Sequence, residues 1–270
     1  GAFAEYSVVK AQGLWIVPEA APEYVGLRIS ALTSCAMLEE TGKLRKGETV
    51  LITAAAGGAG HFAVQLAKLA GCTVIGTCSS AEKAAVLREL GCDHIINHRT
   101  QDVAAELLKI APGGLDVVLE GVGGQMLKTA LGSLGPKGRL LQVGYISEYP
   151  HNKNREAEAA HHGEDTASLF WKAETIHRAD QVIYGNAWPK DFGLVMAKKR
   201  SCPWLAQGRE GAHKKPAIVP QGHLTKTPPL APQLVSLVDS AKVFSGLGEV
   251  PAAVEWMLTG KAIGKVVVAI

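Results

Sequence analysis

The chain has 270 residues, of which 47% are hydrophobic and 20% charged, with a net charge of +3. This composition is typical of a globular protein, and it excludes a membrane-spanning one, because no apolar run reaches the roughly 18 residues that a membrane helix needs. The five cysteines include no CxxC pair and have no regular spacing, which favours free thiols in a reducing compartment.

The N-terminal residues alternate between apolar and polar side chains in the manner of strands. The sequences "GAFAEYSVVK" (residues 1–10) and "LWIVPEA" (residues 14–20) therefore predict two strands. They are followed by "VGLRISALTSCAMLEETGKL" (residues 25–44), which predicts a helix leading into a sheet. Since the chain has no initiating Met and begins on this strand pattern, we expect it to begin inside a domain.

Between residues 47 and 144, short apolar runs alternate with helical stretches. Five continuous runs rich in Val, Ile and Thr predict strands buried on both faces, at residues 48–54, 72–78, 93–97, 115–121 and 138–144. Four stretches with apolar residues three and four positions apart predict helices, at residues 61–71, 80–91, 100–111 and 124–135. This alternation predicts an α/β fold with a doubly wound parallel sheet, the Rossmann arrangement.

The last third of the chain changes in composition. Residues 148–167 are polar and predict a loop, and residues 177–231 keep no period of 2 or 3.6 beyond a few positions. Residues 188–232 hold seven of the thirteen prolines and a net charge of +6, leaving a net charge of −3 on the rest of the chain. We therefore expect residues 177–231 to be disordered, and residues 251–261 and 264–270 to form a helix and a terminal strand.

A glycine-rich turn follows the first run of this α/β pattern, in "TAAAGGAGHFAVQ" (residues 53–65). A dinucleotide-binding turn needs glycine to tighten the bend, to let the backbone approach a pyrophosphate, and to pack helix against strand. Ala55, Gly57 and Gly60 occupy these three places here, so only the first departs from glycine. The turn predicts a bound dinucleotide whose pyrophosphate lies at the N-terminus of the next helix.

The end of the second strand selects between the two nicotinamide cofactors. NADH sites place Asp or Glu there for the ribose 2′-hydroxyl, whereas this chain has Ser79, Ser80 and Lys83, with no carboxylate before Glu82. The third strand is followed by His98 and Arg99. Hydroxyls and cations in this position predict NADPH, with the 2′-phosphate among them. The alternative is a helix-capping serine and a solvated lysine.

Several of these motifs together resemble the medium-chain dehydrogenase/reductase superfamily, in its zinc-free quinone oxidoreductase and prostaglandin reductase branch. The motifs are "GAFAEY", "TAAAGGAGHFAVQLAK", "GTCSSAEK", "LGCD", "EGVGG" and "GYISEY". The similarity runs through residues 1–176 and resumes over residues 234–270. It implies reduction of an activated C=C bond in an enone or quinone by direct hydride transfer from NADPH.

The resemblance also implies roles for individual residues. It places Thr33 near the nicotinamide, Ala56, Gly57, Gly58 and Gly60 under the pyrophosphate, Ser79, Lys83 and His98 around the 2′-phosphate, and Gly121, Val143 and Tyr149 along the path of the riboses. Tyr149 is the one candidate catalytic side chain, to orient the nicotinamide or to assist protonation of the enolate. A packing role for Tyr149 in a loop is the alternative.

The family pattern further implies a division of the chain. Residues 1–32 would be the last part of a GroES-like β-barrel substrate domain, residues 33–176 the NADP-binding Rossmann domain, residues 177–231 the anomalous basic segment, and residues 232–270 the end of the Rossmann domain with a strand returning to the barrel. The family's "GKNxGK" reads "GKAIGK" here, so Ala262 replaces an Asn that contacts the cofactor.

The remaining expectations concern partners and location. We expect no bound metal, because the zinc-binding Cys and His sets of the superfamily are missing, and no nucleic-acid or membrane partner. Intact relatives imply a homodimer, and the location is expected to be cytoplasmic, with the peroxisome as the alternative. The competing function is a non-catalytic NADPH-binding fragment or isoform of such a reductase, which Ala262 and the anomalous segment favour.

Overall fold

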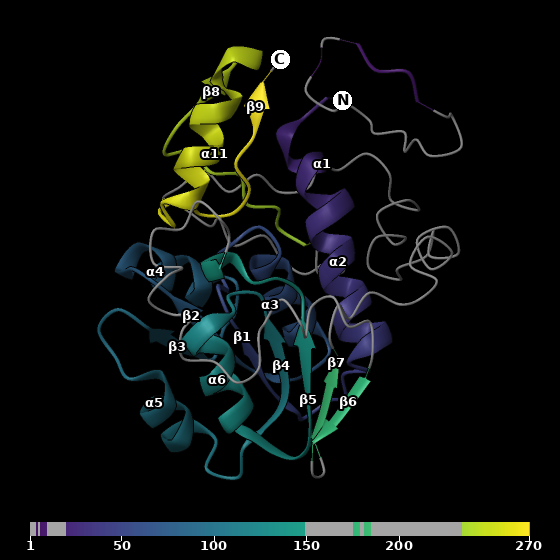
Figure 1. Ribbon diagram of the computed structural model, residues 1–270, viewed down its shortest axis with the longest axis vertical. Coiled ribbons are helices and arrows are strands. Elements are labelled where there is room, and N and C mark those ends of the chain that lie inside the picture. Colours follow the sequence, from purple (N-terminus) through teal and green to yellow (C-terminus); the bar gives the residue numbers. More distant parts are fainter. Residues whose placement is uncertain are drawn as a thin grey trace.

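A seven-stranded sheet forms the centre of the computed structural model, which describes residues 4, 6–9, 20–148, 175–178, 181–184 and 234–269 (Figure 1). The strand order is β3-β2-β1-β4-β5-β7-β6. The strands are β1 (Thr49–Ile52), β2 (Thr73–Cys78), β3 (His94–Asn97), β4 (Leu115–Glu120), β5 (Leu134–Gln142), β6 (Thr175–Arg178) and β7 (Gln181–Tyr184). All neighbours pair in parallel except β6 and β7. The predicted doubly wound sheet is confirmed.

Four helices cross between the parallel strands: α3 (Gly60–Leu69), α4 (Ala81–Glu89), α5 (Val103–Ile110) and α6 (Gly124–Gly132). Each lies within one of the predicted helical stretches or begins a residue before it. The Ser80 hydroxyl caps α4 by accepting from the Lys83 backbone N–H, and the Asp102 carboxylate caps α5 in the same way. These caps fix where two of the helices begin.

Successive residues of the central strands pack into two separate hydrophobic cores, one on each face of the sheet. On β1, Val50 and Ile52 pack into a core with α3 and α4, whereas Leu51 between them packs into a second core with α5 and α6. All three are fully buried. The continuous apolar runs of the sequence thus correspond to strands covered on both faces.

A continuous helical segment precedes β1 and packs on the α3 side of the sheet. It comprises α1 (Pro22–Gly26), the π-helical turn η2 (Leu27–Ala31), α2 (Leu32–Cys35) and a second π-helical stretch η3 (Ala36–Thr41). The predicted helix over residues 25–44 is confirmed, with an earlier start and an earlier end. The boundary expected between residues 32 and 33 falls inside this helical segment.

At the ends of the sheet, one sequence-based expectation is wrong, and a second is wrong for the few residues of its segment that the structure describes. Residues 6–9 form no strand, and Tyr6, Val8 and Val9 are exposed. Residues 14–19 lie outside the described part of the chain. Conversely, residues 181–184 of the segment expected to be disordered form β7, which pairs in parallel with β5 through Val182, Ile183 and Tyr184. The sheet therefore extends past residue 176.

The C-terminal residues return to the carboxyl end of the sheet, where the arrowheads of the parallel strands point (Figure 1). They contain β8 (Phe244–Ser245), the 3-10 turn η5 (Leu247–Glu249), α11 (Val250–Leu258) and β9 (Val268–Ala269). The predicted helix is confirmed as α11. The predicted terminal strand over residues 264–270 is interrupted. Gly264 and Lys265 form isolated parallel bridges with Gly57 and Val238, and β9 pairs with β8. No helix in the described ranges is both long and apolar enough to span a membrane.

Candidate cofactor-binding site

The turn between β1 and α3 is tightly packed against itself. The Gly57 N–H donates to the Ala54 carbonyl at 2.8 Å, and Ala54 has a positive φ of 47°. A Cβ on Gly60 would lie 2.5 Å from the Ala54 oxygen and 2.7 Å from the Ala55 Cα, so only glycine fits there. Ala55 is accommodated because Gly76 stands opposite on β2, where a Cβ would lie 3.0 Å from the Ala55 Cβ.

The polar groups of this turn are used on one side and open on the other. The Ala56 carbonyl accepts from the Gly264 N–H at 2.8 Å, and the Gly57 carbonyl pairs with the His61 imidazole. The N–H groups of Gly58, Ala59 and Gly60 meet no acceptor among the residues that the structure describes. Free N–H groups at the positive end of a helix are the usual arrangement for binding a phosphate.

His61 holds this turn to the C-terminal segment. Its buried ring pairs through Nδ1 with the Gly57 carbonyl at 2.8 Å and through Nε2 with the Leu237 N–H at 3.1 Å. Because the first partner is an acceptor and the second a donor, the ring is neutral with its proton on Nδ1. Burial lowers the pKa of His61 to about 4. Gln65, one turn along α3, pairs with both the N–H and the carbonyl of Val235.

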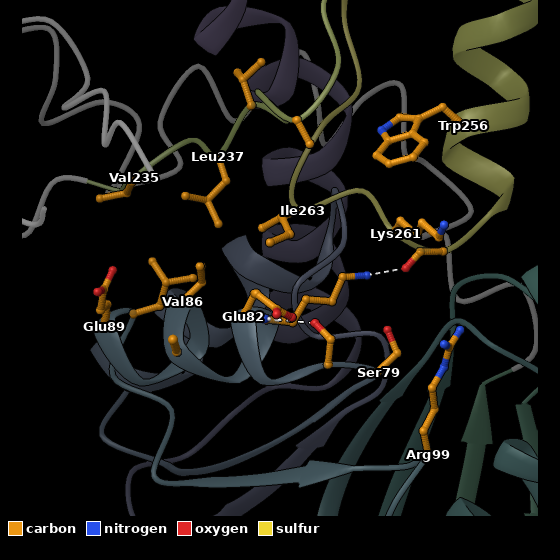
Figure 2. A pocket seen from close by; sticks show the side chains of 17 residues that line it. Ser79, Glu82, Val86, Glu89, Arg99, Val235, Leu237, Trp256, Lys261 and Ile263 are labelled. Atoms are coloured by element: carbon orange, nitrogen blue, oxygen red, sulfur yellow. Dashed lines mark hydrogen bonds between the residues drawn. The ribbon is translucent and has the colours of Figure 1, made fainter. Parts of the chain in front are cut away.

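A cavity of about 580 Å³ lies between α4 and the C-terminal segment (Figure 2). Its walls are mostly apolar and include Val86, Leu237, Ile263 and the Trp256 indole. One end is polar and is formed by Ser79, Ser80, Glu82, Lys83, Arg99 and Lys261. The carboxyl ends of β2 and β3 therefore bring hydroxyls and cations from three separate stretches of sequence into one cavity.

Two of the three residues predicted around the 2′-phosphate, Ser79 and Lys83, line this cavity, and the third, His98, does not. Lys83 is half-buried, its Nζ donates to the Gly260 carbonyl at 2.5 Å, and burial lowers its pKa. His98 is exposed, and its pKa is lowered by partial desolvation and by the neighbouring Arg99 and Lys83 cations. Arg99, which follows His98 after the third strand, lines the cavity wall.

The structure thus supports parts of both interpretations of the "SSAEK" stretch. Ser80 is a helix cap, as the alternative held. Lys83 lines the cavity, and its ammonium group donates to the Gly260 carbonyl. Ser79 does not cap α4. It lines the cavity wall, where its hydroxyl is available to a ligand.

The other predicted residues lie at the ends of β4 and β5 and on α2. Gly121 and Val143 are neighbours, since a Cβ on Gly121 would lie 3.8 Å from a Val143 methyl. Thr33 is buried in α2. Tyr149 lies outside the described residues, so its catalytic role stays a prediction.

Glu120, the first residue of "EGVGG", is a further polar residue at this end of the sheet that was not predicted from the sequence. This carboxylate is fully buried at the end of β4, and it accepts four hydrogen bonds. Burial raises its pKa. A carboxylate directly after a buried strand and before a glycine-rich turn is the signal that could have identified it.

In the described part of the chain, no three His, Cys, Asp or Glu side chains come together as a possible metal site. Cys35, Cys72, Cys78 and Cys92 are buried, and none of them forms a disulfide within the described residues.

Comparison with known proteins places the chain in a family. Residues 58–170 match the sequence pattern of the zinc-binding dehydrogenase family. A probable quinone oxidoreductase of Leishmania amazonensis is 35% identical over 271 residues, which cover 100% of this chain and 71% of the relative. The chain belongs to the medium-chain dehydrogenase/reductase superfamily. Within it, the matches support the quinone oxidoreductase and prostaglandin reductase branch.

A second relative, prostaglandin reductase-3 of Mus musculus, is 52% identical over 149 residues, covering 55% of this chain and 40% of the relative. The chain thus matches less than half the length of this relative. Among solved structures, 2-haloacrylate reductase has a TM-score of 0.61 at 28% identity, covering 97% of this chain and 68% of that one. CurA from Vibrio vulnificus in complex with NADPH has a TM-score of 0.64 at 25% identity, covering 93% and 65%.

Proposed function

We propose that this chain binds NADPH and reduces the activated C=C bond of an enone or quinone. The observation that carries the proposal is the junction of two features at the carboxyl end of the sheet. One is the glycine turn with its free N–H groups beside the switch between β1 and β4. The other is the polar end of the cavity, formed by Ser79, Lys83 and Arg99 after β2 and β3. Dinucleotides bind where the strand order of such a sheet reverses.

The residues at the end of β2 fit NADPH better than NADH. Ser79 occupies the place where a carboxylate would bind the 2′-hydroxyl, and the cations of Lys83 and Arg99 face the same cavity. Glu82 is exposed in the first turn of α4. A phosphate with hydroxyl and cationic donors around it gains charge-assisted hydrogen bonds that a hydroxyl of NADH cannot form. The NADPH complex of CurA supports the same choice.

NADPH bound there would supply a hydride to the β-carbon of the substrate, and a proton at the α-carbon completes the reduction. The chain itself binds and orients. The N–H groups of Gly58, Ala59 and Gly60 would hold the pyrophosphate. Thr33 would lie near the nicotinamide, and Val143 along the path of the riboses. Direct transfer depends on such positioning. Tyr149 remains the proposed residue for orienting the nicotinamide or assisting protonation of the enolate.

The cofactor assignment is tested by binding measurements with NADPH and NADH. Losing one charge-assisted contact to a phosphate costs about 1.5 to 3 kcal/mol, so Lys83→Ala should weaken NADPH binding roughly ten- to a hundredfold. NADH binding should stay nearly unchanged. Lys109→Ala, which removes an exposed lysine on α5, is the matched control and should affect neither. An equal loss for both cofactors in Lys83→Ala would overturn the assignment.

The second candidate function is NADPH binding without catalysis, which the Ala262 replacement in the segment lining the cavity favours. Mixing the chain with NADPH and a small enone separates the two, by following absorbance of the reduced nicotinamide. Consumption of NADPH supports the reductase, and binding without consumption supports the alternative.

We further propose a cytoplasmic location and a homodimer. The buried free thiols of the described cysteines are consistent with a reducing compartment. Gel filtration with light scattering tests the dimer, and imaging of the tagged chain distinguishes cytoplasm from peroxisome.

A further inference from the structure

Two glycine-rich turns lie at the carboxyl end of the sheet, and they differ in whether their backbone N–H groups are hydrogen-bonded. The β1–α3 turn leaves the N–H groups of Gly58, Ala59 and Gly60 open within the described residues. The turn after β4, residues 121–124, has every one of its four N–H groups accepted by a side chain. The acceptors are Thr53 Oγ1 for Gly121, Glu120 Oε1 for Val122, Glu120 Oε2 for Gly123 and Glu148 Oε1 for Gly124, at 2.8 to 3.0 Å.

The carbonyl groups of the second turn are also occupied. Gly121 accepts from the Ile146 N–H, Val122 from the Ser147 N–H and hydroxyl, and Gly123 from the Leu127 N–H. With all donors and most acceptors used, this turn offers no site to an anion, although it begins a helix. A phosphate can therefore bind the open N–H groups at the start of α3 but not the turn at residues 121–124. That turn is held in one conformation by its own hydrogen bonds.

Glu120 is the centre of this arrangement. Its carboxylate is fully buried, and no described Lys or Arg pairs with it. It is satisfied by the Val122 and Gly123 N–H groups, the Thr53 hydroxyl at 3.2 Å and the Gln142 amide at 2.8 Å. An isolated buried carboxylate is costly, and four donors on two oxygens are the compensation available to it. The same amide of Gln142 donates to the Gly144 carbonyl, which links the loops after β4 and β5.

The place of Glu120 in the sheet identifies what this turn serves. The strand order reverses between β1 and β4, so a dinucleotide over that switch has one half on the β2 side and the other on the β4 side. Ser79 and Lys83 mark the β2 side as the 2′-phosphate end. The turn at residues 121–124 therefore lies under the nicotinamide half.

We propose that Glu120 is a positioning residue for the nicotinamide half of NADPH, acting through the turn at residues 121–124 rather than by touching the cofactor. This inference rests on the proposed function. Glu120→Gln is the sharpest perturbation, because each oxygen of the carboxylate faces two donors. Whichever way the amide turns, its NH2 group faces the N–H of Val122 or of Gly123, and that N–H loses its acceptor.

The test compares the whole cofactor with a fragment of it. Adenosine 2′,5′-bisphosphate carries the 2′-phosphate end and no nicotinamide. Because the unpaired N–H displaces the turn that supports the nicotinamide half, Glu120→Gln should weaken NADPH binding. The loss should be at most roughly a hundredfold, which corresponds to the upper cost of about 3 kcal/mol for an unsatisfied buried N–H group. Binding of the fragment should stay within about twofold of wild type, because its contacts lie on the β2 side. A loss of affinity for both ligands, or for neither, would overturn the inference.

Two further variants keep the test decisive. Asp116→Asn changes a carboxylate at the opposite end of β4 that accepts from the Thr49 N–H, and it should alter neither affinity. If Glu120→Gln does not fold, Thr53→Val removes the hydroxyl that contacts both Gly121 and Glu120, with Thr53→Ser as its control. Thr53→Val should then weaken NADPH binding selectively. Wild-type protein that binds no NADPH would refute the proposed function, and the inference with it. Wild-type protein that binds both ligands, with Glu120→Gln binding NADPH as tightly as wild type, would refute the inference alone.

Discussion

The neutral His61 ring makes the stability of this fold sensitive to acid. The ring is fully buried between the glycine turn and Leu237, and its Nε2 must stay unprotonated to accept the Leu237 N–H. Burial lowers the pKa to about 4 from the model-peptide value of 6.5, with the nearby Lys265 charge acting in the same direction. Between about pH 4 and pH 6.5, His61 is therefore protonated in the unfolded chain but neutral in the folded chain.

The size of the effect follows from the two pKa values. Stability contributed by the neutral ring is fully present above pH 6.5, falls as the pH drops from 6.5 to about 4, and changes no further below that. Since one pH unit between the two pKa values corresponds to about 1.4 kcal/mol, the expected loss is about 3 kcal/mol. This is a large share of the 5 to 15 kcal/mol by which domains are typically stable.

The assay is urea unfolding of wild-type protein and His61→Gln at several pH values between 7 and 4. Glutamine keeps an acceptor and a donor without titrating, so carboxylates such as Glu120 affect both proteins equally and cancel in the difference. The stability advantage of wild type at pH 7 should shrink by about 3 kcal/mol as the pH reaches 4. If the free energy of unfolding fell equally with pH in both proteins, the conclusion that His61 is neutral in the folded chain would be refuted.

Two further predictions concern the packing of the sheet. Gly60→Ala should destabilise the fold by about 1 to 3 kcal/mol and weaken NADPH binding, because its Cβ meets only backbone atoms at 2.5 to 2.7 Å. Gly113→Ala, with nothing within 4 Å, should change unfolding by less than about 0.5 kcal/mol, and similar losses in both would contradict the geometry. Arg139→Met should cost about 2 to 4 kcal/mol in urea unfolding, because it strands the largely buried Glu48 carboxylate 2.7 Å away. The double variant with Glu48→Gln should recover most of that loss, and additive losses would refute the pairing.

The sheet could be predicted from the sequence because its signals are local. Each parallel strand is a continuous apolar run between turns, and each crossover helix has its own apolar spacing. The alternation of apolar and polar residues at 6–9 is also a local signal, but the strand that it predicted is not formed. Alternating residues form a strand only where another strand is available to pair. Tyr6 and Val8 are exposed instead. β7 was not predicted, because its four residues are too few to show a period.

The site could be predicted in part, and the residues that were missed are those defined by distant partners. Ser79 and Lys83 follow directly from their place after β2. Glu120 owes its role to Thr53 and Gln142, which lie 67 and 22 residues away along the chain. His61 pairs with Leu237 across 176 residues. The local sequence marks Glu120 only as a carboxylate between a strand and a glycine-rich turn, and the spacing around either residue does not indicate these distant partners.

The central claim is that this chain reduces an activated C=C bond with a hydride taken from NADPH. Isotope tracing tests it most directly: the chain is incubated with NADPH deuterated on the transferred position of C4 and with a small enone, and the product is analysed by NMR. The account predicts a saturated ketone that carries deuterium on its β-carbon and a solvent proton on its α-carbon. A product without deuterium at the β-carbon, or no product while NADPH remains bound, would contradict it.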